Sequence, residues 1–169
     1  MHMHAAAAKM SCGVLIFNCM DINPIIDKYY PEGPLRQTLL VHSRAVADKA
    51  IAIAKAKRLF IDLPFVEEAA MLHDIGIFAT NAPSIHCTGT QPYICHGVIG
   101  SEMLNKLGFP RHALVCERHT GAGLTVDDII RQNLPLPHRD MCPISLEEKL
   151  ICYADKFYSK SCSLKEEKP

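Results

Sequence analysis

The sequence of 169 residues predicts an all-α fold, a single-domain helical bundle. Apolar residues recur at steps of three or four positions, and proline and glycine interrupt the chain at helix-length intervals. The two-residue alternation typical of strands is nearly absent. Because 49% of the residues are hydrophobic, the chain can bury a core of its own. We expect this domain to span residues 23–162, between an N-terminal extension (residues 1–22) and a C-terminal tail (residues 163–169).

Three helices are expected in the first half of the domain, because proline favours the first turn of a helix and glycine its end. They cover residues 23–30, about 35–59 and 64–76. His42 takes a place in the apolar stripe of the long second helix, so we expect it to point inward. A loop over residues 78–92 follows, and loops of this length inside a compact domain are usually functional.

Four more helices are expected in the second half. They cover residues 96–107, 110–120, 125–132 and 145–158. Thr125 is the expected cap of the third of these helices. Ser145, with Glu148 three residues later, matches a capping box at the start of the last one. Asp155 lies on an apolar face of that helix, where a lone acid is unusual.

Composition excludes several classes of partner. The formal net charge is zero, whereas binding to a long nucleic acid usually needs a basic excess, so no nucleic-acid polymer is expected. The apolar runs are too short to span a bilayer, and no membrane partner is expected. The eight cysteines are scattered without a Cys-x-x-Cys pair, which favours a reducing, cytoplasmic location. The oligomeric state is left open.

Six histidine and aspartate residues lie on predicted inward faces, in five separate segments. They are His42, His73, Asp74, His96, His119 and Asp155. A buried carboxylate needs a cation, and neutral imidazole is the commonest metal ligand. Mixed imidazole and carboxylate ligands suit one or two divalent ions, with iron, manganese or zinc favoured and magnesium, nickel or cobalt also compatible. The alternatives are hydrogen-bonded core histidines and a buried salt bridge at Asp155.

The order of these residues resembles the HD superfamily of metal-dependent phosphohydrolases. His42, the His73-Asp74 doublet and Asp155 are similar to the motif that names the superfamily, and residues 73–76 (His-Asp-Ile-Gly) resemble its HDIG variant. His96 and His119 look like the additional histidines of members with two metals. The similarity covers roughly residues 36–160 and implies an all-helical fold of the HD-domain type.

The resemblance also implies which residues bind each metal ion. His42, His73, Asp74 and Asp155 would bind one metal, and His96 and His119 would complete a second that shares Asp74. A metal-bound hydroxide would then attack a small phosphorylated substrate, expected to be a nucleotide. The reaction would be hydrolysis of a phosphomonoester, phosphodiester or pyrophosphate.

One departure concerns the residues after the doublet. Many related subgroups have a lysine there, whereas Ile77 and Phe78 follow Gly76 in this chain. Three cations close in sequence to proposed ligands are the replacement candidates for holding phosphate oxygens, and with the metal-bridging Asp74 they form the expected catalytic set. They are Arg44, Arg118 and Lys156. The alternative for each is a solvated helix charge or a partner of a nearby acid.

Two other functions use the same residues. Some HD-like proteins hold two irons and oxidise a substrate with dioxygen, and a non-catalytic nucleotide-binding regulatory module could keep the site without turnover. Metal content, oxygen consumption and phosphoester turnover distinguish the three. His86, His112 and His138 are not expected to be ligands.

Overall fold

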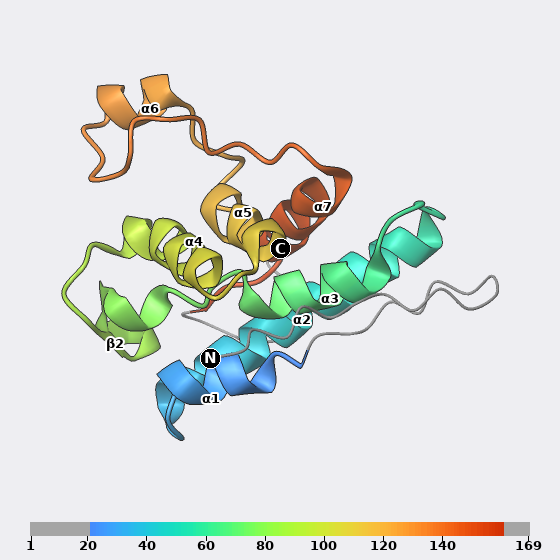
Figure 1. Cartoon of the computed structure of the whole chain (residues 1–169), viewed down its shortest axis with the longest axis horizontal. Helices are drawn as coiled ribbons and strands as arrows, with labels where there is room; N and C mark the ends of the chain where they lie inside the picture. Colours follow the sequence, from blue (N-terminus) through green and yellow to red (C-terminus); the bar gives the residue numbers. More distant parts are fainter. Residues whose placement is uncertain (1–20, 161–169) are drawn as a thin grey trace, which may run out of the picture.

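The computed structural model describes residues 21–160, and the all-α prediction is confirmed. The predicted C-terminal tail and nearly all of the N-terminal extension lie outside the described residues. The helices within the described range follow one another as shown in Figure 1. They are α1 (Asn23–Tyr29), α2 (Pro34–Ala56), α3 (Leu63–Leu72), α4 (His96–Lys106), α5 (Pro110–Arg118), α6 (Val126–Arg131) and α7 (Leu146–Asp155).

Four of the described helices have proline in their first turn, whereas α2, α3 and α7 end three or four residues earlier than predicted. Helices α1, α2, α3 and α5 each have proline in their first two positions. Helix α2 ends at Ala56 because Arg58 adopts a left-handed conformation (φ 51°) and Leu59 N–H bonds back to Ala54 O. Helix α3 ends at Leu72, so the His73-Asp74 doublet begins a turn instead of continuing a helix.

Side-chain caps define the starts of three helices. Thr125 and Asp128 form a complete capping box at α6. At α7 only half of the predicted capping box forms. Ser145 Oγ accepts a hydrogen bond from Glu148 N–H. The Glu148 carboxylate accepts from the backbone N–H of Ile144, whereas a capping box requires the backbone N–H of Ser145. Asp62 caps α3 by accepting from Phe65 N–H, a contact the sequence analysis did not predict.

The long loop after the doublet contains short regular elements. Three single-turn 3-10 helices (Ile77–Ala79, Pro83–Ile85 and Tyr93–Cys95) alternate with two strands, β1 (Asn81–Ala82) and β2 (Cys87–Thr88). The strands pair antiparallel, with Asn81 opposite Thr88. The expectation of a loop without strands is corrected here, because two residues per strand are too few to show a two-residue alternation in sequence.

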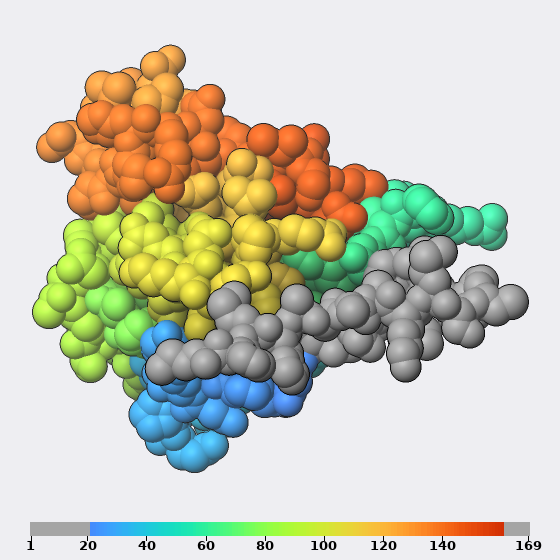
Figure 2. Space-filling model, in the orientation of Figure 1, coloured from blue at the N-terminus to red at the C-terminus, as the bar shows by residue number. Residues whose placement is uncertain are grey.

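The core has three parts. Helices α2, α3 and α7 share one apolar cluster, in which α2 and α3 lie side by side (Figure 1). The second cluster joins α1 and the loop after α3 to α4 and α5. The third lies under α6 and residues 134–141, which together form one end of the molecule in Figure 2. Within the described range, no helix is both long enough and apolar enough to cross a membrane.

Candidate metal centre

Two glycines bring the doublet and the later histidines together. A Cβ atom added at Gly76 would lie 2.2 Å from the carbonyl oxygen of His96, so the turn after the doublet packs directly on the start of α4. A Cβ atom at Gly97 would lie 2.5 Å from the carbonyl oxygen of Cys116 in α5. Only glycine permits this close backbone approach, which sets His96 beside the end of α5, where His119 follows.

The structure brings all six predicted ligands into one buried cluster with Asp74 at its centre. Oδ2 of Asp74 lies 3.3 Å from Nε2 of His42 and 3.1 Å from Nε2 of His73. Its Oδ1 lies 3.4 Å from Nε2 of both His96 and His119. Asp155 Oδ1 completes the first side, 2.9 Å from His42 Nε2. The side chains form two groups that could each hold a metal ion and that share Asp74.

Backbone carbonyls orient three of the four histidines. Nδ1 of His73, His96 and His119 lies 2.6, 2.7 and 2.8 Å from the carbonyl oxygen three residues earlier. A carbonyl oxygen can only accept, so each Nδ1 carries a hydrogen, and in the neutral ring Nε2 presents its lone pair toward Asp74. This is the tautomer that binds a metal through Nε2.

Burial and charge adapt the cluster to cations. Burial raises the pKa of Asp74, but the charges of His73 and Lys160 outweigh it and hold the pKa well below its ordinary value. Burial, together with the neighbouring His119, lowers the pKa of His96 to about 4. His73 Nε2 and Asp74 Oδ1 are buried without a hydrogen-bond partner. Burial lowers the pKa of His73, but Asp74 and Asp155 outweigh it and raise the pKa to about 10, so a bound ion would take the place of a proton on this ring. The ionised Asp74 carboxylate and the neutral His96 imidazole fit a divalent ion, which would offset the cost of their burial.

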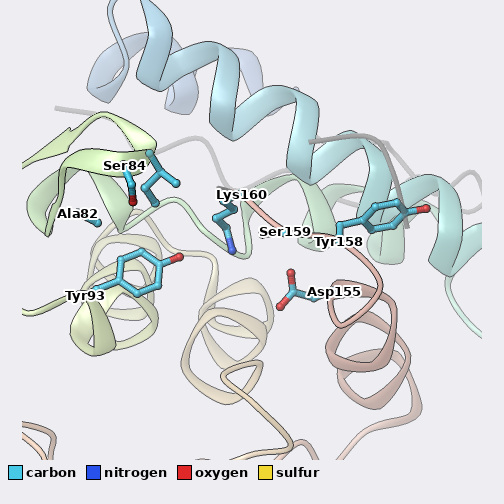
Figure 3. A pocket seen from close by; sticks show the side chains of 8 residues that line it. Ala82, Ser84, Tyr93, Asp155, Tyr158, Ser159 and Lys160 are labelled. Atoms are coloured by element: carbon cyan, nitrogen blue, oxygen red, sulfur yellow. The ribbon is translucent and has the colours of Figure 1, made fainter. Parts of the chain in front are cut away.

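A pocket opens beside the cluster. Its volume is about 300 Å³, and Figure 3 shows the ends of Tyr93, Asp155 and Lys160 directed into it. Ala82, Ser84 and Ile85 contribute the wall from the long loop, as the sequence suggested for that segment. Residues 134–143 contribute none of its lining. The size suits a small compound.

Lys160 is the site residue that the sequence analysis missed. Its Nζ lies 2.7 Å from Asp74 Oδ2, and 14% of its side chain is exposed. Burial lowers the pKa of Lys160, but the charges of Asp74 and Asp155 outweigh it and raise the pKa above its ordinary value. Lys160 follows the end of α7, where helical periodicity no longer indicates direction, so only its five-residue distance from Asp155 could have drawn attention to it.

The three residues predicted to contact phosphate do not line the pocket. Arg44 pairs with Asp48 (2.8 Å) and Glu67 (2.7 Å) and is partly exposed. Arg118 pairs with buried Glu148 at 3.0 Å. Lys156 is exposed just after α7. Their contacts with a substrate stay a prediction.

The three remaining histidines of the described chain lie outside the cluster. His86 and His138 are exposed. His112 is buried, with Nε2 3.3 Å from Glu68 Oε2. None of the three belongs to the two groups of potential metal ligands.

Comparison with known proteins agrees with this geometry. Over 123 residues the chain is 38% identical to an uncharacterized protein of Methanocaldococcus jannaschii, covering 70% of this chain and 65% of that protein. It is also similar to two proteins named tRNA (cytidine(56)-2'-O)-methyltransferase. The one from Picrophilus torridus is 36% identical, over 64% of this chain and 28% of its own length. The one from Thermoplasma volcanium is 30% identical, over 75% of this chain and 33% of its own length.

The chain therefore spans less than two thirds of each of these relatives. No solved structure matches it. The model of the HD domain matches residues 39–159, a range that contains all six clustered histidine and aspartate residues. The chain belongs to the HD domain family.

Proposed function

We propose that this protein is a metal-dependent phosphohydrolase that acts on a small phosphorylated compound, with a nucleotide as the expected substrate class. The observation that carries the proposal is the position of Asp74. Its Oδ2 faces His42 and His73, and its Oδ1 faces His96 and His119. A carboxylate between two sets of ligands suits a pair of divalent ions, for which iron, manganese and zinc are the expected choices.

Different side chains would bind the metal ions and the substrate in such a reaction. When bound, the metal ions would supply a water molecule with its pKa lowered toward neutrality and positive charge for the phosphoryl oxygens. Asp74, Asp155 and the four histidines would hold the ions in a largely buried, preorganised setting. Tyr93 and Ser84 line the adjoining pocket and can hydrogen-bond the rest of a small substrate. No side-chain nucleophile is needed.

The methyltransferase names of two relatives are not carried over to this chain. The chain spans only 28% and 33% of those proteins, so their activity can reside in the part that has no counterpart here. The proposal therefore rests on the histidine and aspartate cluster, which lies within the matched HD domain.

Metal analysis followed by a phosphoester screen tests the proposal. Protein purified without an affinity tag or added metal should contain about two metal ions per chain by mass spectrometry. Asp74→Ala should lose both metal and phosphoester turnover, whereas His138→Ala, at an exposed position, should keep both. Persistent absence of metal, even after metal is added, would contradict the proposal.

Two other outcomes would favour the alternative functions. Oxygen consumption by the iron-loaded protein, without anaerobic turnover of phosphoesters by the manganese or zinc forms, would indicate a di-iron oxygenase. Nucleotide binding without turnover in several metal forms would indicate a regulatory module.

A further inference from the structure

Lys160 places a cation between the metal cluster and the pocket. Its Nζ lies 2.7 Å from Asp74 Oδ2, and the same side chain lines the pocket (Figure 3). Among the described residues that line this pocket, Lys160 is the only cation. Its ammonium group is therefore positioned to contact both the acidic cluster and any molecule in the pocket.

The net charge of the metal-loaded cluster would favour an anion beside the ammonium group of Lys160. Asp74 and Asp155 are the carboxylates of the two potential metal groups, and two carboxylates do not neutralise two divalent ions. With the ions bound, an ammonium group beside Asp74 would be repelled unless an anion lay close to it. The open side toward the pocket is where such an anion can bind.

The pocket also offers neutral donors next to Lys160. The Tyr93 ring stacks on His96, with centroids 4.7 Å apart and an interplanar angle of 23°, which fixes its orientation. Figure 3 shows the Tyr93 hydroxyl directed toward Lys160. Ser84 and Ser159 contribute to the same lining. Ammonium and hydroxyl donors around one small space are suited to phosphoryl oxygens.

We propose that Lys160 is a phosphate-binding residue, whose ammonium group contacts a non-bridging oxygen of the substrate's phosphoryl group beside the metal cluster. The inference deepens the proposed function and rests on it. It assigns the phosphate contact to a lysine after the last ligand, whereas the sequence analysis placed it at Arg44, Arg118 or Lys156. Arg44 and Arg118 pair with acids and do not line the pocket, whereas Lys160 pairs with Asp74 and also lines the pocket.

Binding of inorganic phosphate to the manganese-loaded full-length chain tests the proposal by calorimetry. Lys160→Met should keep its metal but bind phosphate about tenfold or more weakly, as expected for loss of a charge-assisted hydrogen bond. Lys160→Arg should recover most of the affinity. Lys149→Met, on the exposed side of α7, serves as the matched control and should bind like the wild type. Circular dichroism checks that each variant is folded.

Two results would overturn the assignment. Unchanged phosphate affinity in Lys160→Met would show that the lysine does not contact the phosphoryl group. Loss of metal from that variant would show that Lys160 supports the cluster instead of the substrate. The proposed function fails separately: a wild-type protein that binds phosphate through Lys160 but hydrolyses no phosphoester would refute hydrolysis and leave the phosphate contact standing.

Discussion

The hydroxyl group of Tyr30 donates a hydrogen bond to the carbonyl oxygen of Ile75 at 2.8 Å. It also accepts one from Phe78 N–H at 3.3 Å. The ring is 1% exposed, and Ile75 directly follows Asp74. Residue Tyr30, just after α1, thus holds the turn that presents the bridging carboxylate, although it lies outside the cluster itself.

Tyr30→Phe should lower the free energy of unfolding by about 1–3 kcal/mol, because the Ile75 carbonyl and the Phe78 N–H lose a buried partner. Urea denaturation of the metal-free protein measures this change. Tyr29→Phe, at a half-buried neighbouring position, is the control and should cost less. Equal stability of Tyr30→Phe and wild type would show that water replaces the hydroxyl group.

His119→Ala should remove one metal ion and leave the other. His119 faces Asp74 Oδ1 together with His96, whereas Asp155 lies with His42 and His73 on the opposite side. The loss of one imidazole leaves too few ligands on its side only. Mass spectrometry should find about half the metal content of the wild type. Complete loss of metal would show that the two groups bind as one unit.

Gly76→Ala should damage both stability and metal binding. Its new methyl group would overlap the carbonyl oxygen of His96 and force the turn away from α4. Overpacking of this kind typically costs about 1–3 kcal/mol. We expect a lower urea midpoint and weaker binding at the His96 side. Glu102→Ala, at an exposed position of α4, controls for a general effect on the helix.

Protonation of His96 should lower the stability of the metal-free protein as the pH falls from 7 to 5. Its pKa is about 4 in the folded protein and 6.5 in an unfolded chain, so between these values the unfolded state binds more protons. Stability therefore rises with pH in this window and is lost as the pH falls through it.

Urea denaturation at both pH values, in the presence of a chelator, measures the effect. The wild type should lose on the order of 2 kcal/mol more than His96→Gln, which has no imidazole to protonate. The same loss in both proteins would mean that other groups cause the acid sensitivity.

Glu148→Ala should destabilise the link between α5 and α7. Its carboxylate is nearly buried and accepts from Arg118 Nη1 at 3.0 Å and from Ile144 N–H at 2.9 Å. Removing it leaves both donors without this partner, at a cost of about 2–4 kcal/mol in unfolding free energy. Thermal denaturation measures the loss, with Lys149→Ala on the exposed face of α7 as the control. If the melting temperature of Glu148→Ala equals that of the wild type, apolar contacts alone stabilise the packing of α5 on α7.

Local sequence signals predicted the helices and which histidine and aspartate residues face inward. Proline at helix starts and the apolar stripe through His42 depend only on neighbouring residues, and the structure follows them at α2. The grouping of Asp74 with His96 and His119 followed from the resemblance to a family. Periodicity by itself gives the inward faces but not which of them meet.

Long-range contacts could not be predicted in the same way. The partner of Arg118 in the structure is Glu148, 30 residues later, which no local pattern identifies. Lys160 reaches Asp74 across 86 positions of sequence, and it does so from a turn whose direction no repeating pattern specifies. The end of α3 at Leu72 was also missed, because the turn at His73 is held by contacts with α4.

Part of the pocket wall comes from a stretch of chain that holds no cluster residue. The ligands lie within or next to helices that pack through the core, whereas Ala82, Ser84 and Ile85 belong to the loop between α3 and α4. Asp155 is the only cluster residue that also lines the pocket within the described chain. Replacements in this loop can therefore change which compounds bind without altering the metal ligands. Laboratory evolution of new specificities should begin at residues 82–85.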